Sequence, residues 1–365
     1  MRELPLDDIH RLEGAQFVEY AGWRLPLLYI SIIAEHQQVR MRAGITDLSY
    51  MGKIELTGPD IYKLLDRHSS RAIDPEDLGR AYYSLFLTPQ ATIFADVLLF
   101  IRENSCLVTA NPLTTGKVLE RLQEGAKGLD VKIDDKTAEM ALFSIQGRKS
   151  PMALQRITDA VLSDVVPNRF CEAFVAGEEA LLARTSYTGE DGFEVFVSSA
   201  AAQDIWYKML EVGQSEQLVP VGVGARSTLR LEASFPLYGS ELGEEINPLE
   251  ADLAFAANSE ADYIGKEELE KLRKKGVTRK LCGLVVNSRV VARDGFDVLS
   301  EGEKVGEITR GIPSPTLRKR IALAYLPVEL SVPGSEVEVV VRSEAYPAIV
   351  TRKPFYLKKK PVRRF

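Results

Sequence analysis

Residues 184–194, Arg-Thr-Ser-Tyr-Thr-Gly-Glu-Asp-Gly-Phe-Glu, place turn-forming glycines beside an aromatic side chain and three carboxylates. An apolar alternation then begins, in which Glu194 projects from the strand face opposite to Phe193 and Val195. A carboxylate on that face accepts two hydrogen bonds side by side, which suits a planar ligand with neighbouring N–H and amino donors. The alternative is a surface hairpin in which Glu194 is a solvated strand residue.

A second acid, Asp96, lies within the apolar residues 91–100, Ala-Thr-Ile-Phe-Ala-Asp-Val-Leu-Leu-Phe. Burying an ionised carboxylate is costly unless the group is paired or solvated by protein dipoles. From the residues alone, Asp96 is therefore an outward-facing strand residue, a core acid with satisfied hydrogen bonds, or a group retained for chemistry.

Both acids belong to an ordered series of motifs that resembles the T protein of the glycine cleavage system, an aminomethyltransferase that uses tetrahydrofolate. The resemblance runs from about residue 12 to about residue 356. Its motifs are Glu-Tyr-Ala-Gly-Trp (19–23), Gly-Ile-Thr-Asp-Leu-Ser-Tyr-Met (44–51), Ala-Tyr-Tyr-Ser (81–84), Ile-Gln-Gly (145–147), Gly-Ala-Arg (224–226), Leu-Arg-Leu-Glu-Ala (229–233), Tyr-Gly (238–239), Asn-Pro (247–248), Gly-Glu-Ile-Thr (306–309) and Ser-Pro (314–315).

The resemblance implies a reaction of glycine catabolism. A one-carbon unit, carried as an aminomethyl thioether on a lipoyl carrier protein (the H protein), passes to tetrahydrofolate, and ammonia is released. Asp96 matches the family's catalytic aspartate, which would stabilise the iminium ion formed as the carbon–sulfur bond breaks and manage the proton of a folate nitrogen.

The resemblance also implies the folate-binding residues. Glu194 matches the position that pairs with the pterin edge, and Arg226 matches the arginine that holds the folate. Aromatic and other side chains would line the pocket, where rings stack on the flat ligand. These pocket-lining positions are Tyr83, Tyr187, Met51 and Asn111.

Three of the residues that depart from the family's usual motifs bear on the identity of the one-carbon donor. Ala95 replaces the first of two adjacent aspartates, Tyr50 replaces the histidine of a Ser-His-Met triplet, and Ser227 replaces the aspartate of Gly-Ala-Arg-Asp. These substitutions leave open a folate-dependent demethylase that acts on another amine, ether or sulfonium donor. A non-catalytic folate-binding protein is a third hypothesis, against which the retained Asp96 counts.

Composition restricts the class of protein. The chain of 365 residues is 45% hydrophobic and 27% charged, as in ordinary globular proteins. Its net charge of -6 argues against a nucleic-acid partner. Three widely spaced cysteines give neither a disulfide framework nor metal-ligand spacing. No apolar run is long enough to span a bilayer, and the first residues lack a targeting signal, so we expect a cytoplasmic protein without a membrane partner.

The spacing of apolar residues predicts the helices and strands that must position these side chains. Together these elements indicate an α+β fold. A strand, a helix, two antiparallel strands and a second helix are expected at 53–57, 61–65, 93–101, 105–110 and 114–125, the order of a ferredoxin-like split βαβ unit. Further helices are expected at 31–43, with Ser31 as N-cap and Gly44 as the stop, and at 266–276. Short strands at 281–286, 306–309, 321–325 and 336–341 predict a small C-terminal barrel or sandwich.

The resemblance implies three domains in a cloverleaf around a central folate pocket. Residues 1–51 and 140–275 would form a discontinuous folate-binding domain, 52–139 the ferredoxin-like domain carrying Asp96, and 276–365 the β-barrel. The tail from residue 357 onward is basic. It is expected to be solvated, and a role in steering an acidic carrier protein is the functional alternative.

Overall fold

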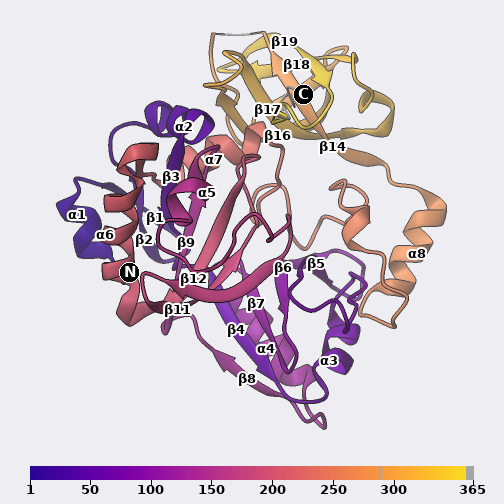
Figure 1. Ribbon diagram of the computed structural model, residues 1–365. Coiled ribbons are helices and arrows are strands. Elements are labelled where there is room, and N and C mark those ends of the chain that lie inside the picture. Colours follow the sequence, from indigo (N-terminus) through magenta and orange to yellow (C-terminus); the bar gives the residue numbers. More distant parts are fainter. Residues whose placement is uncertain (288, 359–365) are drawn as a thin grey trace, which may run out of the picture.

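The computed structural model describes residues 1–287 and 289–358 (Figure 1). Within this part, a six-stranded sheet, a five-stranded sheet, a two-stranded ribbon and a closed six-stranded barrel make an α+β fold. The expected class is therefore confirmed. No helix in the described ranges has the length and apolarity to cross a membrane. Most of the basic tail, residues 359–365, lies outside the described residues.

The six-stranded sheet has the order β10-β11-β12-β9-β3-β13. Side chains alternate between the two faces of this sheet. One face, which includes Phe143 and Phe193, is buried against helix α6. The other face packs toward the five-stranded sheet, where Phe196 contacts Phe100. The elements are β3 (Ala43–Asp47), β9 (Met140–Gln146), β10 (Phe170–Val175), β11 (Glu178–Ala183), β12 (Gly192–Ser198), β13 (Leu218–Pro220), α5 (Ser150–Leu154) and α6 (Ala202–Val212). The N-terminal α1 (Asp7–Leu12) and the ribbon β1 (Gln16–Tyr20) and β2 (Trp23–Leu28) precede it.

The five-stranded antiparallel sheet has the order β5-β6-β7-β4-β8. Read as β8-β4-β7-β6, this is the ferredoxin-like order, with β5 added at the edge. Its apolar face packs on two helices through residues such as Leu64 and Val118. The elements are β4 (Gly52–Thr57), α3 (Ile61–His68), β5 (Ala81–Leu87), β6 (Ile93–Ile101), β7 (Ser105–Ala110), α4 (Thr115–Gly125) and β8 (Lys132–Asp135). The predicted unit is confirmed, and the edge strand β5 is additional.

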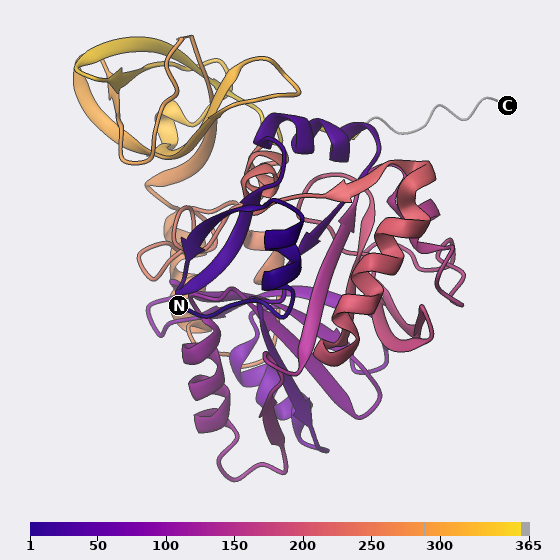
Figure 2. The same cartoon turned by 90° about the vertical axis from the view of Figure 1, so that its left-hand side faces the viewer.

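The C-terminal barrel closes in the order β14-β17-β16-β15-β18-β19. Its interior holds alternate residues of each strand, among them Leu284 and Val339. The barrel and the five-stranded sheet lie at opposite ends of the molecule (Figure 2). The elements are α8 (Lys266–Lys275), β14 (Arg279–Val286), β15 (Asp297–Ser300), β16 (Glu303–Pro313), β17 (Arg320–Pro327), β18 (Glu336–Val341) and β19 (Glu344–Thr351). The barrel prediction is confirmed.

Helices α2 (Ile32–Met41) and α7 (Val223–Glu232) pack together beside the six-stranded sheet. Gly224 permits this approach, because a Cβ there would lie 2.8 Å from both Ile32 Cγ1 and Leu27 O. Ser31 caps α2 as expected, its hydroxyl accepting from Ala34 N at 3.1 Å. The expected stop at Gly44 is wrong: the helix ends at Met41, since pairing of β3 with β9 already places Gly44 opposite Gln146.

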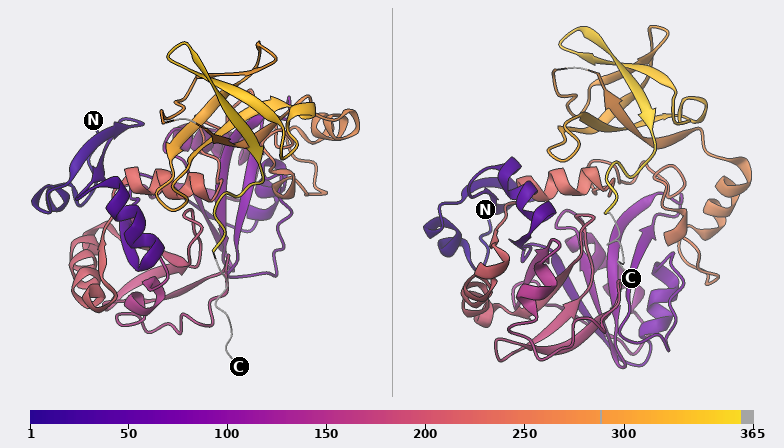
Figure 3. Two further views of the ribbon diagram at one scale, coloured as in Figure 1. Left: turned by 90° about the horizontal axis from the view of Figure 1, so that it is seen from above. Right: turned by 45° about the horizontal axis from the view of Figure 1, so that its top comes forward.

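Glu232, the last residue of α7, joins α2 to the barrel, beneath which α7 runs (Figure 3). Its Oε2 accepts from Arg40 Nη2 at 2.9 Å and lies 3.2 Å from His36 Nε2. Its Oε1 accepts from Thr316 N at 3.0 Å and from the Ser314 hydroxyl, both in the barrel loop. The carboxylate is completely enclosed. It therefore stabilises the contact between these elements.

Glu232→Gln is expected to lower the free energy of unfolding by about 1–3 kcal/mol, because Arg40 and the barrel loop lose a buried ionised partner, while Glu190 remains 3.3 Å from Arg40. Desolvation raises the pKa of Glu232, but the bond with His36 and its other partners outweigh it and hold the pKa at about 2. A depressed folded pKa gives stability that is present above the ordinary value of 4.5 and lost as pH falls through about 2. Urea unfolding from pH 7 to pH 2 measures both effects.

The exposed Glu211, paired with Lys208 on α6, supplies the control. Glu211→Gln should change stability by no more than about 1 kcal/mol. An unchanged acid dependence in Glu232→Gln would contradict the assignment of this pH sensitivity to Glu232.

Candidate functional site

Asp96 projects from β6 on the face opposite to helices α3 and α4, since its neighbours Ala95 and Val97 pack in the cluster beneath those helices. Tyr83 on the adjacent β5 donates a hydrogen bond from its hydroxyl to Asp96 Oδ2 at 3.3 Å. Oδ1 is buried and has no hydrogen-bond partner among the described residues. Asp96 is therefore neither an outward-facing residue nor a satisfied core acid.

Burial raises the pKa of Asp96 to about 6, while its own backbone N–H and Tyr83 act in the opposite direction. Burial likewise raises the pKa of Tyr83 well above its ordinary value, and Asp96 and Tyr187 add to the rise. A perturbed carboxyl group with a free oxygen and an aromatic hydrogen-bond donor is typical of a functional site.

Tyr187 precedes β12 of the six-stranded sheet and lies near Tyr83 and Asp96. Its hydroxyl donates to Pro236 O, and its ring stacks on Phe235 with centroids 5.6 Å apart. The Arg226 guanidinium carbon, from α7, lies 4.8 Å from the centre of the Tyr187 ring. Arg226 makes no ion pair with any residue that the structure describes, so its donors are available to an anionic or polar ligand.

Glu194 lies on β12, and the hairpin interpretation in which it is solvated is wrong. Its exposed fraction is 7%, and Thr185 donates a hydroxyl hydrogen bond to its Oε2 at 2.5 Å. The other two carboxylates of residues 184–194 serve the fold: Glu190 accepts from Arg40 at 3.3 Å, and Asp191 pairs with Arg184 at 2.7 Å. Glu194 has no cation partner among the described residues, whereas Glu190 and Asp191 are each paired with an arginine.

Tyr50 connects Glu194 with Arg226. Burial raises the pKa of Tyr50 to about 12; the charge of Arg226 opposes this rise, and Tyr20, Asp47 and Glu194 add to it. These groups are therefore near enough to interact electrostatically within one site.

The last two predicted residues occupy the edge near β7. Asn111 Oδ1 accepts from Leu113 N at 3.0 Å and from the Tyr20 hydroxyl at 3.5 Å. Asp96 contributes to the raised pKa of Tyr20, which links Asn111 to the central carboxylate. Met51 packs partly buried against the apolar cluster that contains Tyr50. All seven predicted residues thus gather where the two sheets and α7 meet.

Sequence reasoning missed a buried ion pair at this site. Arg230 Nη1 donates to Glu241 Oε2 at 2.7 Å and to Phe235 O at 3.1 Å, while its Nε and Nη2 have no partner in the described part of the chain. Its charge opposes the pKa rise of Tyr187. Arg230 lies four residues after Arg226 on the same helix, and residues at this spacing share one helix face. This spacing could have indicated Arg230 as a site residue.

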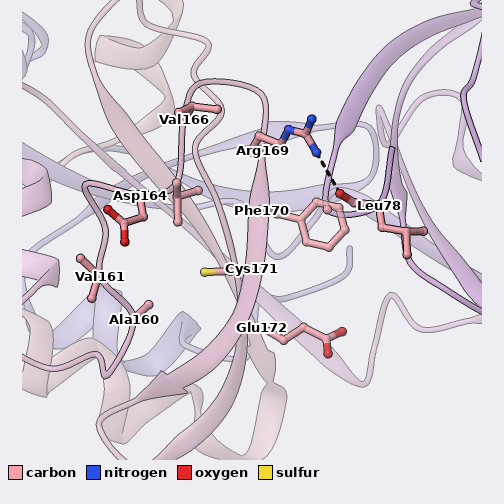
Figure 4. A pocket seen from close by; sticks show the side chains of 11 residues that line it. Leu78, Ala160, Val161, Asp164, Val166, Arg169, Phe170, Cys171 and Glu172 are labelled. Carbon is pink, nitrogen blue, oxygen red and sulfur yellow. Dashed lines mark hydrogen bonds between the residues drawn. The ribbon is translucent and has the colours of Figure 1, made fainter. Parts of the chain in front are cut away.

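A separate cavity of about 540 Å³ lies beside the edge strand β10 (Figure 4). It is lined by residues of loop 160–166 and by Phe170, Cys171 and Glu172, and its Arg169 already donates to Leu78 O at 2.9 Å. None of the seven predicted site residues lines it. The cavity is therefore distinct from the cluster around Asp96.

Comparison with known proteins supports one family over the whole chain. Residues 6–261 match the model of the GCVT N-terminal domain, and residues 279–356 match that of the glycine cleavage T-protein C-terminal barrel domain. An aminomethyltransferase of Rubrobacter xylanophilus is 40% identical over 362 residues, covering 99% of this chain and 95% of that protein. One of Bacillus subtilis is 38% identical over 360 residues, covering 98% and 99%.

Among solved structures, the glycine cleavage system aminomethyltransferase T of Bartonella henselae superposes with a TM-score of 0.91. It is 28% identical in sequence and covers 97% of this chain and 98% of its own. The sequence and structural similarities therefore extend over both sheets and the barrel.

Proposed function

The chain belongs to the glycine cleavage T-protein family of aminomethyltransferases, and on this basis we propose that it transfers a one-carbon unit from an aminomethyl-lipoyl carrier protein to tetrahydrofolate, releasing ammonia. The observation that carries the proposal is Asp96, with its unpartnered Oδ1 and a pKa of about 6 among aromatic side chains. Tetrahydrofolate, when bound, supplies the nitrogen atoms that accept the carbon.

The residues present fit a folate. Tyr83 and Tyr187 offer ring surfaces for a flat pterin or benzoyl group. Glu194 keeps one carboxylate oxygen beyond the one that Thr185 uses, which suits the N–H and amino donors of a pterin edge. Arg226 has its guanidinium donors available for polar or anionic parts of the ligand.

Asp96 has two roles in the proposed reaction. At neutral pH most of the group is ionised, since its pKa is about 6. A carboxylate in a partly buried site stabilises positive charge that develops on the donor carbon as the carbon–sulfur bond breaks. Its Oδ1, which has no partner among the described residues, can accept a proton from an amine nitrogen held beside it.

We further propose that the lipoyl carrier docks transiently and that the reaction takes place in the cytoplasm. The cysteines Cys106, Cys171 and Cys282 are all free. Free thiols are usual in proteins of a reducing compartment.

The test supplies purified protein with tetrahydrofolate and aminomethylated lipoyl carrier, and measures methylenetetrahydrofolate and ammonia. Stoichiometric formation of both products is expected. In a parallel reaction, methylated amines replace the lipoyl carrier as the one-carbon donor. Product from the methylated amine alone would favour a demethylase, and folate binding without product from any donor would favour a non-catalytic role.

A further inference from the structure

Lys53, the second residue of β4, is a lysine with no exposed surface. Its Nζ donates to the carbonyl oxygen of Ser49 at 2.8 Å and to that of Met51 at 2.9 Å. A buried ammonium is costly unless such bonds compensate for lost hydration. The two acceptors flank Tyr50, so one charged group holds both ends of a three-residue segment.

Residues 49–51 are also held by hydrogen bonds to groups other than Lys53. Asp47 Oδ1 accepts from Ser49 N at 2.8 Å, and Asp47 Oδ2 lies 3.1 Å from His10 Nε2. The Ser49 hydroxyl accepts from Leu142 N at 3.1 Å, which ties the segment to β9. The segment 49–51 is therefore held by hydrogen bonds to β4 and β3 through its backbone and to β9 through the Ser49 hydroxyl.

This segment carries two side chains of the site. Tyr50 is 7% exposed, and its ring meets the Tyr20 ring edge to face with centroids 6.5 Å apart. Met51 packs against the same cluster. A displacement of the segment would move Tyr50 relative to Glu194 and Arg226, whose charges influence the pKa of Tyr50.

We propose that Lys53 is a positioning residue for the folate pocket, whose ammonium holds the carbonyls of Ser49 and Met51 and thereby sets the place of Tyr50 and Met51. The inference rests on the proposed function. Lys53 itself touches no ligand in this proposal; it acts through the backbone of residues 49–51.

The charge of Lys53 makes this support sensitive to alkaline pH. Burial lowers the pKa of Lys53 to about 8, against the opposing effects of Asp47 on β3 and Asp135 on β8. Above that pH the neutral amine forms hydrogen bonds roughly half as strong as those of the ammonium. Folate affinity should therefore weaken as pH rises through about 8.

The stability of the fold should change in the opposite direction. The folded pKa lies below the ordinary lysine value of 10.5, so between about pH 8 and 10.5 the unfolded chain binds more protons than the folded chain. Stability from this group therefore rises over that range. A residue that served only the fold would not strengthen stability while weakening ligand binding.

The experiment measures the Kd of tetrahydrofolate by anaerobic equilibrium dialysis, and the melting temperature, from pH 7 to pH 9.5 in the full-length protein. For Lys53→Met we expect a Kd about tenfold higher at pH 7 and a melting temperature unchanged or raised, because a buried charge is removed. The wild-type Kd should rise above pH 8, and the variant's Kd should stay flat. Lys132→Met, at an exposed position on β8, is the control and should match the wild type.

Two results would overturn the inference while leaving the proposed function intact. One is an unchanged Kd in Lys53→Met, and the other is a wild-type pH dependence that persists in the variant. A melting temperature that falls together with affinity would show a structural role only. Absence of tetrahydrofolate binding by the wild type at every pH would overturn the proposed function, and this inference with it.

Discussion

Asp96→Asn is expected to slow formation of methylenetetrahydrofolate by about 10²–10⁴-fold and to leave the Kd of tetrahydrofolate nearly unchanged. The amide keeps the shape and the bond from Tyr83 but removes the negative charge and the proton-accepting oxygen. Single-turnover rates with aminomethylated carrier and equilibrium dialysis of the folate separate the two effects. Equal rates for the variant and the wild type would contradict the mechanism.

The same variant should not lose stability. The folded pKa of about 6 exceeds the ordinary value of 3.8, so above pH 3.8 the ionised carboxylate costs the folded state free energy. Removing the charge should therefore leave the melting temperature equal or higher, which distinguishes loss of chemistry from loss of fold. A lower melting temperature would make the rate loss ambiguous, and the pH profile would then decide.

That profile depends on Tyr83. The proposed reaction requires ionised Asp96, so the wild-type rate should fall as pH drops below about 6. The Tyr83 hydroxyl favours the ionised form, and Tyr83→Phe should raise the pKa of Asp96 and move the acid limb to higher pH. An acid limb that does not move would assign the titration to another group.

Glu194→Gln is expected to raise the Kd of tetrahydrofolate by roughly 5–150-fold, the equivalent of about 1–3 kcal/mol for a buried polar group that loses its partner. Glutamine replaces one acceptor by a donor, which would face the N–H and amino groups of the pterin edge. The rate at saturating folate should change little, because Glu194 is assigned to binding. Equilibrium dialysis and steady-state kinetics measure the two quantities.

Glu179→Gln, an exposed position on the neighbouring β11, is the matched control and should bind folate like the wild type. If Glu194→Gln instead lowered the saturated rate and left the Kd unchanged, Glu194 would act in the chemistry and the division of roles between the two acids would be wrong.

Local patterns were sufficient for much of the fold. Alternation in residues 193–197 correctly placed Glu194 opposite to the buried Phe193, and the strands at 93–101 and 105–110 pair as expected. Local patterns failed where a partner strand overrides propensity. The helix expected to reach residue 43 ends at Met41, because pairing with β13 and β9 draws Ala43 and Gly44 into a sheet.

Sequence motifs also indicated the seven candidate site residues, because a motif depends only on residue types and their order along the chain. Their meeting could not be derived from any local pattern. Asp96 comes from the five-stranded sheet, Glu194 from the six-stranded sheet and Arg226 from α7. Long-range packing brings together groups that lie between 32 and 130 positions apart in the sequence.

The electrostatics of the site likewise arise from packing. Identical carboxylates have different roles because their surroundings differ: Glu232 is held ionised by cations, whereas desolvation raises the pKa of Asp96 to about 6. Lys53 reads in the sequence as an ordinary polar residue of an alternating strand, and only its burial beneath residues 49–51 gives it two carbonyl partners. The amino-acid sequence specifies which groups are present, and the tertiary structure sets their desolvation and their neighbours, on which pKa and binding depend.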